Sequence, residues 1–188
     1  MSDFDPILSV YASDLPGEPD GLERIWAPYR MPYLLGENRP PDTDAGPQCP
    51  FCRVPTGSDA QGLIVARGET VFAVLNLYPY ATGHVMVCPY RHVAWYTELT
   101  DAETTEVGVF TKRAMGVLQT VSSCQGFNIG LNQGAVAGAG ISGHLHQHIV
   151  PRWGNDANFM PIIAGVRVMP ALLHQTRELM ASTWQRVG

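Results

Sequence analysis

The sequence predicts an α+β fold in which one antiparallel five-stranded sheet packs with one main helix and helical ends. Three observations support this prediction: short apolar strand-like segments, one long segment with helical periodicity, and connections rich in Gly and Pro. The 188 residues, of which 45% are hydrophobic, suffice for a single domain that buries roughly 70% of its unfolded surface.

The five strands are predicted from β-branched and apolar runs that end at turn residues. The first two form a hairpin around Arg67-Gly68-Glu69, and a loop broken by Pro79 precedes the third. The predicted strands are Leu63 to Ala66, Val71 to Asn76, His84 to Cys88, Gly126 to Leu131 and His144 to Val150.

The main helix begins at a capping box, in which the Thr100 hydroxyl and the Glu103 carboxylate accept first-turn amide protons. Apolar residues at helical spacing follow, and the helix is expected to end near Ser122. Shorter helices are predicted over Gly21 to Tyr29 and Pro170 to Gln185. The apolar positions of the main helix are Val107, Phe110, Ala114, Val117 and Val121.

The chain is expected to form one domain over residues 21–188, preceded by an N-terminal arm over residues 1–20. Within the domain, residues 36–60 are predicted to be a loop because they are dense in Pro, Gly and Asp. Residues 60–155 form the core, and residues 156–188 form a C-terminal extension with a helix.

The composition argues against two classes of partner. A net charge of −5 disfavours a broad nucleic-acid surface, although a phosphorylated small molecule remains compatible with it. No apolar run approaches the roughly 20 residues that span a bilayer, so no membrane partner is expected. The acidic N-terminus does not resemble a signal peptide, and a cytoplasmic location is expected.

Three histidines alternate at His144, His146 and His148, in front of the apolar pair Ile149-Val150. In a strand, residues two apart share a face, which would place neighbouring imidazoles about 6.6 Å apart. The row could be structural, could share a metal ion, or could attack a substrate. The small-residue loop from Asn132 to Gly140 leads into it, and backbone amides in such a loop approach anionic oxygens closely. Attack at phosphorus is therefore the favoured interpretation.

The pair Cys49 and Cys52 could be redox-active or could supply half of a metal site. A redox pair is expected at a helix N-terminus after a strand, whereas this pair lies in a long predicted loop. Two thiolates cannot complete a tetrahedral site alone, and His92 and His144 could supply the remaining ligands.

The segment from His144 to Val150 resembles the signature of the histidine triad (HIT) family of nucleotide hydrolases and transferases. The resemblance extends through Val74 to Pro79, Gly83 to Pro89 and Arg91-His92-Val93. Residues 26–31 and 151–159 resemble the bacterial branch that includes diadenosine tetraphosphate (Ap4A) phosphorylases. The family implies one HIT-like domain and a homodimer whose sheets meet across the interface.

Carried over by position, the resemblance implies that His146 is the nucleophile and that His148 contacts phosphate oxygens or the leaving group. His84 would complete the histidine cluster, although it could merely cap a loop. The implied zinc ligands are Cys49, Cys52, His92 and His144, and the filled site would be structural.

The resemblance also implies nucleotide-binding positions. Asn76 would bind ribose, unless it only starts a turn. Trp153 would stack on a base, or else pack in the core or at an interface. The phosphates would meet Asn132 and the amides of Gly138, Ala139 and Gly140. Many relatives carry a hydroxyl where this chain has Ala139-Gly140, so more of the phosphate contacts would fall to backbone amides.

The expected function is cleavage of an adenine dinucleoside polyphosphate, with phosphorolysis of Ap4A to ADP and ATP through a covalent His146–AMP intermediate. Inorganic phosphate would be the second substrate. Two alternatives remain open at this point: an enzyme that hydrolyses the P–N bond of an AMP phosphoramidate, and a non-catalytic nucleotide-binding regulator.

Overall fold

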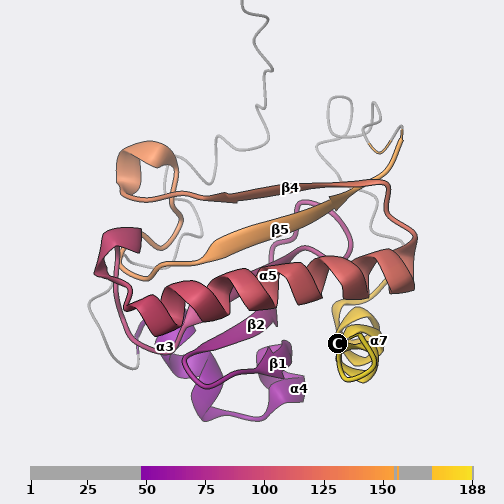
Figure 1. Cartoon of the computed structure of the whole chain (residues 1–188), viewed down its shortest axis with the longest axis horizontal. Coiled ribbons are helices and arrows are strands. Elements are labelled where there is room, and N and C mark those ends of the chain that lie inside the picture. The colour runs from indigo at the N-terminus through magenta and orange to yellow at the C-terminus, as the bar shows by residue number, and fades with distance from the viewer. Residues whose placement is uncertain (1–47, 155, 157–170, 188) are drawn as a thin grey trace, which may run out of the picture.

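The computed structural model describes residues 48–154, 156 and 171–187, which form an α+β fold around one antiparallel sheet (Figure 1). The strand order is β1-β2-β3-β5-β4, which confirms the predicted five-stranded antiparallel sheet. Every strand pair is antiparallel. The strands are β1 (Ile64–Arg67), β2 (Val71–Leu75), β3 (Val85–Pro89), β4 (Gly126–Leu131) and β5 (Gln147–Arg152).

One face of the sheet packs against the long helix α5 (Asp101–Ser122) (Figure 1). Its start and end agree with the sequence prediction, including the capping box between Thr100 and Glu103. Helix α7 (Leu173–Trp184) adds Met180 and Trp184 to the same core. The α5 residues in this core are Val107, Phe110, Ala114, Val117 and Leu118. Within the described ranges, no helix combines the length and apolar character needed to cross a bilayer.

The opposite face of the sheet is covered near β2 and β3 by the segment that precedes β1. This segment forms α3 (Pro50–Arg53), the 3₁₀ turn η2 (Val54–Thr56) and α4 (Asp59–Gly62). Phe51 is buried there against Phe72, Val74 and Met86. Because directly opposed residues share a face, His148 of β5 lies on this side with Met86 of β3.

The predicted strand at His144 to Val150 begins later than expected. β5 starts at Gln147, where the pairing with both Val87 and Leu131 begins. The reason lies in the neighbouring strands: β3 ends at Pro89, which has no N–H to continue the ladder, and β4 ends at Leu131. Leu145 N–H instead donates to the Val93 carbonyl at 2.7 Å.

Other differences are local. The described part of the predicted 36–60 loop contains the short helices α3 and α4, and Ser58 caps α4 by accepting from Gln61 N–H. Two further 3₁₀ turns, η3 (Tyr96–Glu98) and η4 (Ala135–Ala137), lie in predicted connections. The predicted arm over residues 1–20 and the helix over Gly21 to Tyr29 lie outside the described residues.

Glu103 links the start of α5 to the segment after β3. Its carboxylate accepts from Arg91 Nε at 3.0 Å and from Arg91 Nη2 at 2.7 Å, and it also accepts from Thr100 N–H at 2.8 Å. The Glu103 side chain is 6% exposed, whereas that of Arg91 is 48% exposed. Chiefly because of the Arg91 guanidinium, the pKa of Glu103 is lowered to about 2.

We expect Glu103→Gln to destabilise the protein by about 2 kcal/mol at pH 7, because the charged acceptor of a two-point contact is lost. For a chain of this size, the melting temperature should fall by about 4–8 °C. A lowered carboxylate pKa stabilises the fold above the unfolded value, and this contribution disappears as the pH falls from about 4.5 toward 2. Calorimetry across pH 7 to 3 should show the difference between variant and wild type shrinking. The control is Asp101→Asn, which removes one negative charge from an exposed residue in the same turn of α5.

Candidate functional site

Three imidazoles gather on the sheet face opposite α5, at the junction of β3 and β5. His84 and His146 are buried, and His148 is half-buried. The ring centroids of His84 and His148 lie 5.0 Å apart, and those of His146 and His148 lie 4.9 Å apart in an edge-on arrangement. The structure therefore brings together the three histidines that the family resemblance predicts to be catalytic.

A chain of hydrogen bonds fixes the proton positions of His84 and His148. Tyr80 N–H donates to His84 Nδ1 at 3.1 Å, so this nitrogen accepts and His84 Nε2 carries the proton. We assign the 2.9 Å contact between His84 Nε2 and His148 Nδ1 as a donation from His84. Neutral His148 then carries its own proton on Nε2, where it can donate to a ligand.

His146 has the opposite arrangement. Its Nδ1 lies 2.8 Å from the His144 carbonyl oxygen, which can only accept, so Nδ1 carries the proton. Nε2 is left with a lone pair. The site thus combines a nucleophilic ring nitrogen on His146 with a neighbouring N–H donor on His148.

Burial keeps His146 and His148 neutral. Desolvation lowers the pKa of His148 to about 4, and the charge of His146 contributes in the same direction. Desolvation also lowers the pKa of His146, although its bond to the His144 carbonyl partly opposes the shift. At neutral pH the His146 lone pair is therefore available without prior deprotonation.

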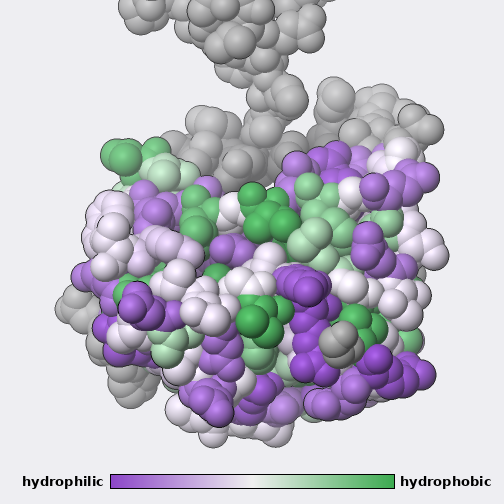
Figure 2. Space-filling model, in the orientation of Figure 1, coloured by the Kyte–Doolittle hydropathy of each residue, from purple (hydrophilic) through white to green (hydrophobic). Residues whose placement is uncertain are grey.

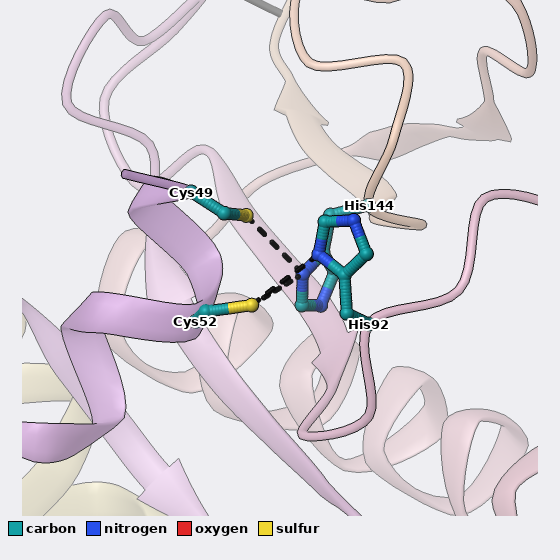
Figure 3. Close-up of side chains that lie close together, drawn as sticks. All are labelled: Cys49, Cys52, His92 and His144. Carbon is teal, nitrogen blue, oxygen red and sulfur yellow. Dashed lines mark hydrogen bonds between the residues drawn. The ribbon is translucent and has the colours of Figure 1, made fainter. Parts of the chain in front are cut away.

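A second cluster joins Cys49, Cys52, His92 and His144 (Figure 3). His144 Nδ1 lies 3.4 Å from Cys49 Sγ and 3.5 Å from Cys52 Sγ, and His92 Nδ1 lies 3.3 Å from Cys52 Sγ. All four potential ligand atoms lie within 4.8 Å of one another. The cluster predicted from the sequence is thus assembled from three separate segments and could hold a metal ion.

The surroundings of the cluster suit a cation. His144 Nε2 lies 2.9 Å from the Pro89 carbonyl, so it donates there and leaves Nδ1 unprotonated for coordination. Desolvation lowers the pKa of His144 to about 4. Burial raises the pKa of the Cys49 thiol, and a bound cation would favour its thiolate.

The predicted nucleotide-binding positions lie around the histidines. Asn76 is half-buried, with its amide nitrogen 3.4 Å from His84 Nδ1. Its side-chain oxygen accepts from Tyr78 N–H at 2.9 Å, which is the geometry of a turn-starting Asn. The turn interpretation of Asn76 therefore has a structural counterpart, and its ribose contact remains a prediction.

The predicted phosphate loop connects β4 to His144 and includes Asn132. Gly134 and Gly138 adopt φ of +77° and +79°, which favours glycine, and Ala139 is buried. The loop is docked at its start, where Gln133 Oε1 accepts from Tyr96 N–H at 2.6 Å. Consistently, η3 and η4 lie at the same end of the sheet in Figure 1. The phosphate contacts of Asn132, Gly138, Ala139 and Gly140 remain predictions.

Trp153 lies apart from the histidine cluster. Its indole N–H donates to the Ser122 carbonyl at the end of α5, at 3.0 Å, and its ring packs against the core on the α5 side of the sheet. These contacts match the packing alternative considered for Trp153, rather than stacking on a base.

Two aromatic residues that the sequence does not predict for the site lie near the histidines. The Tyr80 ring lies 4.7 Å from that of His84 and 5.9 Å from that of His148, and the Phe51 ring lies 4.9 Å from that of His146. Tyr80 acts on His84 through a backbone N–H, which leaves no side-chain signature. The only available signal for Phe51 was its position between the two cysteines.

The chain is similar to several known proteins. The HIT domain matches residues 58–155. A Mycobacterium tuberculosis protein named AP-4-A phosphorylase is 52% identical over 172 residues, which cover 90% of this chain and 88% of that protein. The asymmetrical bis(5'-nucleosyl)-tetraphosphatase of Schizosaccharomyces pombe is 34% identical over 102 residues, or 54% of this chain and 53% of that one.

Among solved structures, a Zn-bound histidine triad family protein from Mycobacterium smegmatis superposes with a TM-score of 0.59. It is 22% identical, and the match covers 73% of this chain and 94% of that one. At this identity the likeness supports the fold alone. Together with the matched domain and the 52% identical relative, the histidine cluster shows that this chain belongs to the HIT family.

Proposed function

We propose that this protein is a nucleotidyl hydrolase or transferase that phosphorolyses Ap4A to ADP and ATP through a covalent His146–AMP intermediate. The observation that carries the proposal is the His146 ring, whose Nδ1 proton is held by the His144 carbonyl while Nε2 keeps its lone pair. The name of the Mycobacterium tuberculosis relative supports the choice of substrate.

In the first step, His146 Nε2 attacks the α-phosphorus of one adenylyl group. The new P–N bond forms as the bond to the bridging oxygen breaks, and ATP leaves. His148 Nε2–H donates a hydrogen bond to the departing oxygen, and His84 holds His148 in that orientation. In the second step, an oxygen of inorganic phosphate attacks the same phosphorus, the P–N bond breaks, and ADP forms.

The substrate is proposed to lie across the loop that precedes His144. Asn132 and the amides of Gly138, Ala139 and Gly140 would face the phosphates, and Asn76 would bind ribose. The left-handed glycines at positions 134 and 138 support this proposal, because they let the backbone approach a ligand without an intervening side chain.

We propose zinc as the ion of the Cys49, Cys52, His92 and His144 cluster. Tetrahedral zinc with bonds of about 2.3 Å to sulfur and 2.0–2.1 Å to nitrogen separates S and N ligands by about 3.5 Å. Three of the four S–N distances in the cluster are 3.3, 3.4 and 3.5 Å, and all four ligand atoms lie within 4.8 Å of one another. A site with four protein ligands has no open position, so zinc would stabilise the α3 turn against the segment that precedes β5.

A cytoplasmic homodimer is proposed as the working state. β4 lies at an edge of the sheet, and Ile129 on it is 45% exposed. Apolar side chains gather over β4 on the face shown in Figure 2, where a second copy could cover them. Light scattering should give twice the chain mass of 20.5 kDa, and a monomer at micromolar concentration would contradict the dimer.

Product analysis tests the reaction. With Ap4A and inorganic phosphate, we expect ADP and ATP in equal amounts. Without phosphate, turnover should stop after one equivalent of ATP has been released. Steady formation of AMP and ATP without phosphate would show that the protein hydrolyses Ap4A instead of phosphorolysing it. Cleavage of an AMP phosphoramidate alone would indicate a P–N hydrolase instead.

A further inference from the structure

We propose that Phe51 is a positioning residue for His146, so that the turn carrying two metal ligands also orients the nucleophile. This inference rests on the proposed function, in which His146 attacks phosphorus. It adds to that function a physical link between the cysteine-containing turn and the reacting nitrogen.

The contact between Phe51 and His146 is direct. Phe51 lies in α3, is only 6% exposed, and its ring centroid is 4.9 Å from that of His146 with an interplanar angle of 35°. This separation lies within the range of favourable aromatic pairs, about 4.5–7 Å. The same ring lies 5.5 Å from His144, at 61°. Phe51 therefore packs against His146, the proposed nucleophile, and against His144, whose carbonyl accepts the His146 Nδ1 proton.

Packing restrains His146 because, in the part of the chain that the structure describes, its ring is hydrogen-bonded at Nδ1 alone. The Nδ1 contact with the His144 carbonyl fixes one point of the ring and leaves rotation about the side chain to be restrained by neighbours. His148 meets His146 edge-on at 80°, and Phe51 lies more nearly parallel to it. A ring rotated away from this position would lose the Nδ1 bond and turn Nε2 from the substrate.

Phe51 is itself held by its neighbours in the chain. Cys49 precedes the α3 turn and Cys52 lies within it, and the turn closes through donation from Arg53 N–H to the Cys49 carbonyl at 3.0 Å. Both sulfur atoms approach His144 Nδ1. A metal ion held by these cysteines would fix the turn, and with it the ring that lies on His146. The metal site would thus influence the reaction through position alone.

The test compares Phe51→Leu with Phe51→Tyr in the metal-loaded protein. Leu keeps an apolar side chain but lacks a flat ring, whereas Tyr restores the ring. The control is Phe110→Leu on α5, since Phe110 is similarly buried at 7% exposure and packs on Trp184 on the other side of the sheet. For each variant, long-range 1H–15N spectra of the His146 ring, metal content, kcat and KM are measured.

We expect Phe51→Leu to bind one metal ion per chain but to lose the single Nδ1–H pattern of His146. The value of kcat should fall about tenfold or more, by a larger factor than any change in KM, because a small misplacement of the reacting atom is costly. Phe51→Tyr should recover both readouts. Phe110→Leu should lower the melting temperature while leaving the His146 signals and kcat unchanged.

Unaltered His146 signals and kcat in Phe51→Leu would overturn the proposal. A change confined to KM would also overturn it, since Phe51 would then be a wall of the binding site. Should the wild type fail to cleave Ap4A, the proposed reaction is wrong, whereas the spectra still decide whether Phe51 positions His146.

Discussion

Replacing His146 with Ala is expected to lower kcat for Ap4A by a factor on the order of 10⁴ or more, because the variant cannot form the covalent intermediate. The neighbouring His148 is not arranged to substitute for it, because His148 donates from Nε2 and its Nδ1 accepts from His84. Binding of the nucleotide should persist, since the loop that precedes His144 is untouched. Stopped-flow and steady-state assays with Ap4A and phosphate measure the loss.

Intact-protein mass spectrometry provides an independent check. Wild-type protein quenched without phosphate should carry one added AMP, and His146→Ala should carry none. His174→Ala is the matched control, because His174 is an exposed histidine on α7, away from the sheet face that bears the cluster. Full turnover by His146→Ala, or an AMP adduct that survives the substitution, would refute the role of His146.

Removal of the metal ligands should have the largest effect on stability. We expect the double variant Cys49→Ala/Cys52→Ala to lose one equivalent of zinc per chain. With free zinc at about a thousand times its Kd, binding stabilises the folded chain by about 4 kcal/mol. For a chain of this size, that corresponds to a fall in melting temperature of about 8–16 °C. A chelator should shift the wild type by a similar amount and leave the double variant unchanged.

Cys124→Ala is the control for the loss of a thiol. Cys124 is also buried, but it belongs to the core on the α5 side of the sheet, away from His92 and His144. It should retain zinc and lose little stability. Elemental analysis and calorimetry on the same samples decide the matter. Wild-type protein without zinc but with an unchanged melting temperature would contradict the proposed structural role.

The secondary structure was largely predictable because its signals are local. The Thr100 and Glu103 pair marks the start of α5, and the apolar positions of that helix repeat at helical spacing. The strands are short β-branched runs between turns, and their limits agree with the structure to within a residue or two, apart from β5. The cluster of Cys49, Cys52, His92 and His144 was also foreseen, because metal ligands are distinctive residue types.

What the sequence could not reveal depends on contacts between distant segments. The proton on His84 is placed by the backbone N–H of Tyr80, and any residue other than proline could supply that donor. The contact of Phe51 with His146 joins residues 95 positions apart. The packing of Trp153 against the end of α5 likewise requires knowledge of how the sheet and helix meet. Pattern and propensity contain none of this information.

The late start of β5 has a consequence for chemistry. Inside a central strand, each backbone carbonyl accepts a hydrogen bond from one of the two adjacent strands. His144 lies three residues before Gln147, the first residue of β5 that pairs with β3 and β4. Its carbonyl oxygen can therefore accept the hydrogen bond from His146 Nδ1. If the strand pairing extended to His144, a backbone N–H of a neighbouring strand would compete for that oxygen. The His146 proton could then lie on either ring nitrogen. The incomplete ladder thus leaves Nε2 as the His146 ring nitrogen that carries a lone pair.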